Sequence, residues 1–177
     1  MSLNRNLVKQ IAIGVWDITS NGTLATNAAY GCNTTTAGGR AAGGGAVIIP
    51  EGALLTNAYY YVETTVSDDG DDSTGLSLGY TGATAAFVAN IAISATGTNG
   101  VAGGQWDAGV HQTLIGSPHD EEGADAETQL ENSHNIALGM TAITADVELL
   151  LTLANDHAVD AGKFTLYVEY VQTGDLS

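Results

Sequence analysis

Residues 163–171 read KFTLYVEYV, and this stretch indicates the fold class. Large apolar side chains at even positions alternate with more polar ones at odd positions, a period of two that predicts a β-strand with one core face and one wetter face. The predicted core positions are Phe164, Leu166, Val168 and Tyr170. Residues 146–153 (DVELLLTL) predict a more fully buried strand, and the polar residues 155–162 between the two stretches predict an antiparallel hairpin.

The alternation continues upstream of this hairpin. Residues 54–66 and 76–80 predict a second hairpin, with the acidic turn at 68–72, which reads DDGDD, as its loop. Further strands are expected at residues 9–18, 45–49, 111–115 and 135–142.

Residues 84–95 (TAAFVANIAISA) are compatible with either a strand or a helix. The alanines and Thr84 as an N-cap favour a helix, whereas Val88 and Ile91 also suit a strand, and we expect a short helix. With about eight strands at the spacing typical of sandwiches, the sequence predicts an all-β fold. The expected architecture is a single antiparallel β-sandwich or jelly roll with at most one short helix.

The chain has 177 residues, enough for one well-buried core. We expect one β-sandwich domain at residues 11–177, preceded by an N-terminal arm at residues 1–10. Apolar residues make up 44% of the chain and charged residues 14%, a balance typical of folded proteins. No apolar run approaches the roughly 20 residues that span a bilayer, so no membrane partner is expected. The glycine-rich stretches at 37–46 and 97–104 are interpreted as flexible loops.

The chain carries 20 acidic and 4 basic residues, a formal net charge of −16. Phosphate backbones and anionic lipids are bound by clustered lysines and arginines, so this charge argues against nucleic acid and membrane surfaces as partners. Half of the cations, Arg5 and Lys9, lie in the N-terminal arm, where they interleave with Leu3 and Leu7. These four residues are candidates for contact with a neighbouring subunit; the alternative is a frayed chain end.

No motif in the sequence carries recognisable catalytic or cofactor chemistry. The chain has no GxSxG nucleophile elbow, no HExxH pair and no glycine-rich loop with phosphate-binding spacing. Cys32 is the single cysteine and is expected to be a small buried side chain. The acidic turn at 68–72 departs from the EF-hand order and is interpreted as a solvated turn, with opportunistic cation binding as the alternative. The four histidines lack ligand spacing. We therefore expect no enzyme activity, no cofactor and no metal site.

Four aromatic residues are candidates for stacking on a sugar ring: Trp16, Trp106, Tyr59 and Tyr61. Trp16 lies within a predicted strand and is expected in the core. Trp106 follows a glycine-rich stretch and is the strongest candidate for ligand stacking. The alternative for Trp106 is that its indole covers one end of the core, which is the more common use of such a residue.

Three segments together resemble small β-sandwich virion proteins encoded among the head genes of tailed phages. They are residues 52–56 (GALLT), 75–82 (GLSLGYTG) and 161–171 (AGKFTLYVEYV). The resemblance spans residues 46–171 except for the acidic stretch at 117–133, and it implies a capsid decoration (cement) protein or head fibre.

Such a protein binds the outside of the major capsid protein shell, and it is often a homo-oligomer, with a trimer favoured. The resemblance further implies location on the virion surface, and in the host cytoplasm during assembly. A carbohydrate- or receptor-binding sandwich of a tail or head fibre is the alternative, and an uncatalogued hydrolase is a distant third.

Overall fold

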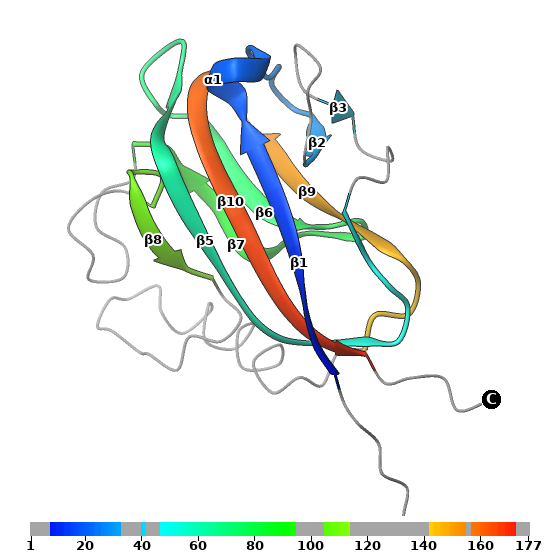
Figure 1. Cartoon of the computed structure of the whole chain (residues 1–177). Helices are drawn as coiled ribbons and strands as arrows, with labels where there is room; N and C mark the ends of the chain where they lie inside the picture. The colour runs from blue at the N-terminus through cyan, green and yellow to red at the C-terminus, as the bar shows by residue number, and fades with distance from the viewer. Residues whose placement is uncertain are drawn as a thin grey trace, which may run out of the picture.

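The computed structural model describes residues 8–32, 40–41, 47–94, 105–113, 142–154 and 157–172. These residues form two antiparallel sheets packed face to face, which confirms the predicted all-β sandwich (Figure 1). The first sheet has the strand order β1-β10-β5-β8, and the second has the order β3-β2-β9-β6-β7, with β4 pairing to β9. The strands of the first sheet are β1 (Val8–Asp17), β10 (Val159–Gln172), β5 (Ala53–Asp68) and β8 (Gly109–Gln112). Those of the second are β3 (Arg40–Ala41), β2 (Ala29–Gly31), β9 (Val147–Ala154), β6 (Gly75–Tyr80), β7 (Ala83–Ala92) and β4 (Ile48–Ile49).

The first sheet is built around β10, the strand that carries the KFTLYVEYV sequence. β1 pairs with β10 in one unbroken register, from Val8 opposite Gln172 to Asp17 opposite Lys163. On its other side β10 pairs with β5, and this register shifts at several points along the ladder. The predicted core positions of β10 are all buried, so the alternation in the sequence places one face of this sheet in the core.

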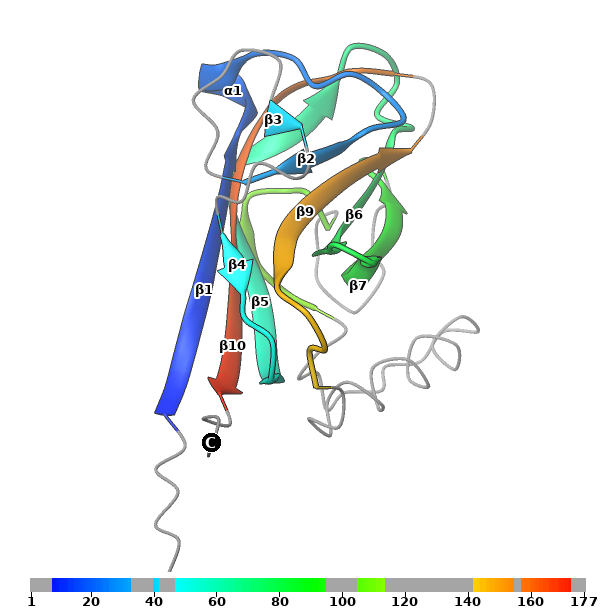
Figure 2. The same cartoon turned by 90° about the vertical axis from the view of Figure 1, so that its right-hand side faces the viewer.

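The second sheet departs from simple alternation. Both β9 and β6 are buried on nearly every residue, and β7 lies beside β6 at the end of this sheet (Figure 2). A Cβ atom at Gly79 would lie 2.2 Å from the carbonyl oxygen of Ala83, and one at Gly75 would lie 2.1 Å from Oδ1 of Asn90. Glycine at these two positions therefore permits the close approach of the two strands.

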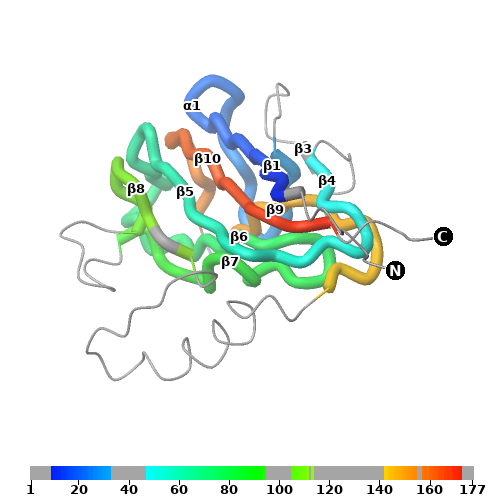
Figure 3. The backbone as a smooth tube through the Cα atoms, turned by 60° about the horizontal axis from the view of Figure 1, so that its bottom comes forward, coloured from blue at the N-terminus to red at the C-terminus, as the bar shows by residue number. Residues whose placement is uncertain are grey.

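The two sheets form two layers (Figure 3), and the core between them is rich in aromatic rings. Phe164 stacks on Trp16 with ring centroids 5.3 Å apart and meets Trp106 edge-on at 5.5 Å. The indole N–H of Trp16 donates to the backbone oxygen of Tyr30 at 3.3 Å. Trp16 and Cys32 are both fully buried, as the sequence predicted.

Residues 84–95 are the main correction to the sequence-based prediction, because β7 replaces the short helix expected there. Phe87 and Val88 are neighbours, yet both are buried. The pairing of β6 with β7 shifts register between Leu76 and Leu78, next to Val88, and this irregularity interrupts the period of two. One short helix does occur in the described residues, but it is α1 (Ile18–Asn21), directly after β1.

Other segments also differ from the prediction. Neither expected hairpin forms, because β5 and β10 belong to the first sheet whereas β6 and β9 pair with each other in the second. β3 lies within the glycine-rich stretch interpreted as a loop, and it pairs with β2, which was not predicted. β1 begins at Val8, so the last three residues of the expected arm are part of the sheet. The strand expected at 135–142 and the loop expected at 97–104 lie outside the described residues. Within the described residues, no helix is long and apolar enough to cross a membrane.

Candidate interaction surface

The outward-facing side chains of the first sheet form a surface that we call the outer face. Its apolar and aromatic members come from all four strands and alternate with the core positions. They include Ile11, Ile13, Val15, Tyr59, Tyr61, Val110 and Tyr167. The described residues include five large apolar side chains that are exposed, and four of them lie on this face. The fifth, Ile48, lies on β4 in the second sheet.

Cross-strand pairing makes this surface continuous. Ile13 lies opposite Tyr167, and Tyr167 lies opposite Tyr59. The rings of Tyr59 and Tyr167 are stacked, with centroids 4.9 Å apart and planes 14° from parallel. In the adjacent row Tyr61 lies opposite Val110 at the β8 edge. Exposed fractions on the face reach 42% for Tyr61 and 66% for Val110, so much apolar surface faces solvent.

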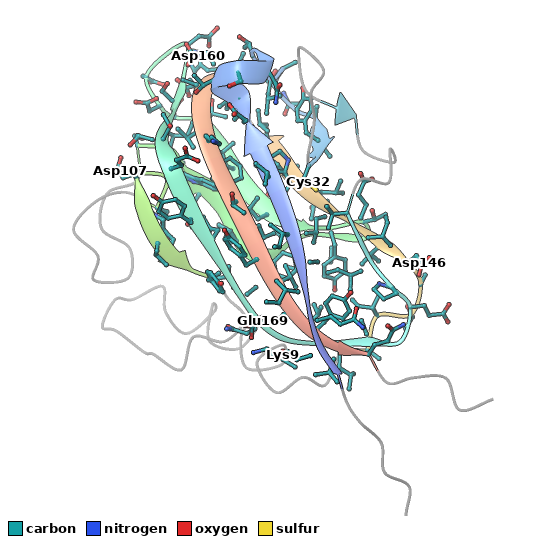
Figure 4. The ribbon with its side chains drawn as sticks, viewed as in Figure 1. Lys9, Cys32, Asp107, Asp146, Asp160 and Glu169 are labelled. Carbon is teal, nitrogen blue, oxygen red and sulfur yellow. The ribbon has the colours of Figure 1, made fainter. Side chains whose placement is uncertain are left out.

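Charged side chains lie at the two ends of the outer face. At one end Lys9 pairs with Glu169 at 2.5 Å (Figure 4), and at the other Lys163 pairs with Glu63 at 2.8 Å. The hydrogen bond to Glu63 raises the pKa of Lys163, with a smaller contribution from Asp17. The face carries two cations and four carboxylates, Asp17, Glu63, Asp160 and Glu169. Its net charge is therefore −2, in a chain whose net charge is −16.

Trp106, the residue predicted for ligand stacking, does not belong to this surface. Its side chain is fully buried, and its indole N–H donates to the backbone oxygen of Ile91 at 3.2 Å. Its ring packs on Tyr60 and Phe164. The prediction of an exposed stacking residue is therefore wrong for Trp106, which has the core-covering role that was the alternative.

Of the four residues predicted for contact with a neighbouring subunit, the structure describes one. Lys9 lies on β1 at the edge of the outer face, and its side chain is exposed apart from its ion pair with Glu169. Leu3, Arg5 and Leu7 lie outside the described residues. Most of the outer face was not singled out from the sequence, although Tyr59 and Tyr61 were named there as stacking candidates. The alternation in β1 and β10 was the signal that pointed to it.

The acidic turn between β5 and β6 is held together by one carboxylate. Asp68 accepts backbone N–H bonds from Gly70 and Asp72 at 2.9 Å each, and from Thr74 at 3.0 Å. Burial disfavours ionisation of Asp68, but the hydrogen bonds outweigh that effect and lower its pKa to about 2. The oxygens of Asp68 are thus used within the turn, as an Asx-type turn requires.

The described residues contain no cluster of three or more side chains suited to holding a metal ion. His111 is buried, with its Nε2 atom 2.7 Å from the backbone oxygen of Asp107. His157 lies at the acidic turn, 3.7 Å from a carboxylate oxygen of Asp69 and of Asp71. The other two histidines, His119 and His134, lie outside the described residues.

Comparison with known proteins adds one structural similarity. No protein-family model and no curated protein matches the sequence. Among solved structures, the chain is similar to a chain of the cyanophage Pam1 capsid asymmetric unit, with a TM-score of 0.52 and 14% sequence identity. The similarity covers 97% of this chain and 89% of that chain. At this identity the comparison establishes a shared fold along nearly the whole length of both chains.

Proposed function

We propose that this chain is a structural protein of a tailed-phage particle, and specifically a decoration protein on the outside of the major capsid shell. The observation that carries the proposal is the shared fold with a chain of a phage capsid asymmetric unit, which extends over 97% of this chain. Because the match covers nearly the whole of both chains, the similarity includes the complete sandwich rather than one hairpin.

The charge of the chain supports an outer position. Packaged DNA lies inside a capsid, and a body with a net charge of −16 is repelled by phosphate. A protein on the outer surface avoids that repulsion. The proposed partner is therefore the major capsid protein, with a location on the virion surface and in the host cytoplasm during assembly.

The N-terminal segment is the proposed contact with the capsid. Residues 1–7 lead directly into β1, the strand that places Lys9 and Ile11 at one edge of the outer face. Leu3, Arg5 and Leu7 supply apolar surface and a positive charge in an otherwise acidic chain. A cation in such a segment orients and accelerates encounter with a protein surface more than it adds to affinity.

The test of this function is analysis of purified particles. We expect mass spectrometry of gradient-purified phage to find the chain in the head fraction at a fixed ratio to the major capsid protein. A variant lacking residues 1–7 should fold, as judged by circular dichroism, and should bind particles more weakly than the full chain. Absence of the chain from heads, or its presence only in tails, would contradict the decoration role.

Glycan or receptor binding is less well supported, because its strongest candidate residue, Trp106, is buried. Tyr61 is the aromatic side chain of the outer face with the larger exposed area. A glycan array comparing the native chain with the Tyr61→Ala variant separates the two functions. Specific glycan binding that the substitution abolishes would favour a fibre tip over a decoration protein.

A further inference from the structure

We propose that the outer face of the first sheet is the surface through which copies of this chain associate with one another. Both the low net charge of this face and its exposed apolar side chains support the proposal. Two molecules that each carry a net charge of −16 repel over most of their surfaces. The outer face has 4 of the chain's 20 acidic residues and 2 of its 4 basic residues, so two copies approach there with less repulsion than elsewhere.

The charged groups at the ends of this face are already partnered within one chain. Lys9 is paired with Glu169, and Lys163 with Glu63. The middle of the face consists of Ile13 and the stacked rings of Tyr59 and Tyr167. An almost neutral apolar centre with polar ends is the composition typical of a protein–protein contact. Such a patch on a strongly charged molecule marks an interaction site.

The size of the face is sufficient for a stable contact. Three strands about 4.8 Å apart and ten residues long at about 3.4 Å per residue, with the shorter β8, cover about 550 Å² in plan. Side chains make the accessible area larger than the plan area. A standard interface buries about 800 Å² on each partner, so the outer face would supply most of the area that one copy contributes.

This inference goes beyond the proposed function and is tested on purified protein without phage. Sedimentation velocity and light scattering should show a native chain that self-associates at micromolar concentration, with the assembly state read from the same data. Salt should strengthen the association, because screening weakens the repulsion between the acidic bodies more than it weakens an apolar contact. Association that weakens with salt would mean that ion pairs between copies hold the contact.

Two identical substitutions provide a matched comparison. Ile13→Glu places a carboxylate in the centre of the outer face, whereas Ile48→Glu makes the same change on β4 of the second sheet. The two isoleucines are similarly exposed, at 46% and 40%, so both variants should fold. We expect Ile13→Glu to weaken self-association about tenfold or more, and Ile48→Glu to leave it close to that of the native chain.

A second variant covers the case in which a substitution in β1 disturbs folding. Tyr61→Glu changes the same face on β5, and circular dichroism reports whether each variant keeps its strands. The proposal requires that folded Tyr61→Glu dissociates like Ile13→Glu. A native chain that stays monomeric at tens of micromolar would overturn it, and so would equal effects of Ile13→Glu and Ile48→Glu. None of these outcomes depends on whether the chain binds capsids.

Discussion

The two sheets differ in the size and exposure of the side chains at their outward-facing positions. In the first sheet, β1 and β10 alternate core residues with large exposed residues such as Ile11 and Ile13. In the second sheet, β6 alternates Leu76 and Leu78 with glycine and serine, and all of these residues are buried. The outward positions of β6 are thus small and buried, whereas the outward side of the first sheet carries large exposed side chains.

The difference shows that a period of two in sequence does not by itself mark a solvent-facing side. Where the alternate positions carry large side chains, as in β10, the outward side of the sheet stays accessible to solvent. Small residues at those positions, as at Gly79, allow a strand to come close. The contrast predicts how substitutions on the two sheets should differ, from the largest effect on stability to the smallest.

The largest effect is expected at the core between the two sheets. Trp106→Ala should lower the free energy of unfolding by about 3–5 kcal/mol, because it removes a fully buried ring that packs on Tyr60 and Phe164. Urea denaturation monitored by circular dichroism measures the change, with Tyr59→Ala on the outer face as the control. A loss below about 1 kcal/mol for Trp106→Ala would restore the indole as a candidate for ligand contact.

The next effect is expected on the outward side of the second sheet. Gly79→Ala should cost about 2 kcal/mol, because the new methyl group would meet backbone atoms of Ala83 and Thr84 that cannot rotate away. Thr84→Ala, at an exposed position of β7, is the control and should change stability by less than about 0.5 kcal/mol. If the two variants melt at the same temperature, β7 is not packed closely on β6.

The connection between the sheets should show a smaller effect that depends on pH. Asp68→Asn replaces a carboxylate that accepts three backbone hydrogen bonds, and should cost about 1.5 kcal/mol near neutral pH. The folded pKa of Asp68 is lowered to about 2 from an ordinary value of 3.8, so ionised Asp68 stabilises the fold above about pH 4. That contribution is lost as the pH falls towards 2.

Unfolding free energies of the native chain and of Asp68→Asn, measured between pH 6 and pH 2, test this dependence. The difference between them should shrink as the pH falls. Glu51→Gln, which neutralises an exposed carboxylate at another turn, should show no comparable trend. A constant difference over the whole range would mean that Asp68 is stabilising for a reason other than its charge.

The smallest effect on stability is expected on the outer face. Ile11→Ala removes an exposed side chain and should change the free energy of unfolding by less than about 0.5 kcal/mol. Thermal melting of dilute protein provides the measurement, since dilution removes any contribution from association. A loss above about 1.5 kcal/mol would show that Ile11 is packed within the monomer rather than available for contact.

Much of the fold follows from the sequence, and the exceptions have physical causes. The core positions of β10 are predictable from alternation, but the expected C-terminal hairpin is wrong. β10 pairs with β1 and β5 in the first sheet, whereas β9 pairs with β2, β4 and β6 in the second. β7 was not predicted, because its register shift buries both Phe87 and Val88 and its alanines favour a helix. β2 and β3 are too short to leave a periodic signal.

The candidate surface was only partly predictable. The positions of Tyr59 and Tyr61 on one side of a strand follow from local alternation. Whether Ile13 and Val110 lie on the same surface depends on which strands are neighbours in the sheet. Strand order is set by contacts between distant segments, which a single sequence does not reveal. Burial of Trp106 has the same origin, because its partner Phe164 lies in the C-terminal strand.

The central claim, that this chain is an outer component of a phage head, is tested most directly by co-sedimentation. Purified chain is mixed with capsid shells assembled from the major capsid protein of the same genome, and the pellet is measured over a range of concentrations. We expect saturable binding with a fixed number of chains per shell. A chain that remains in the supernatant at every concentration, while folded by circular dichroism, would contradict it.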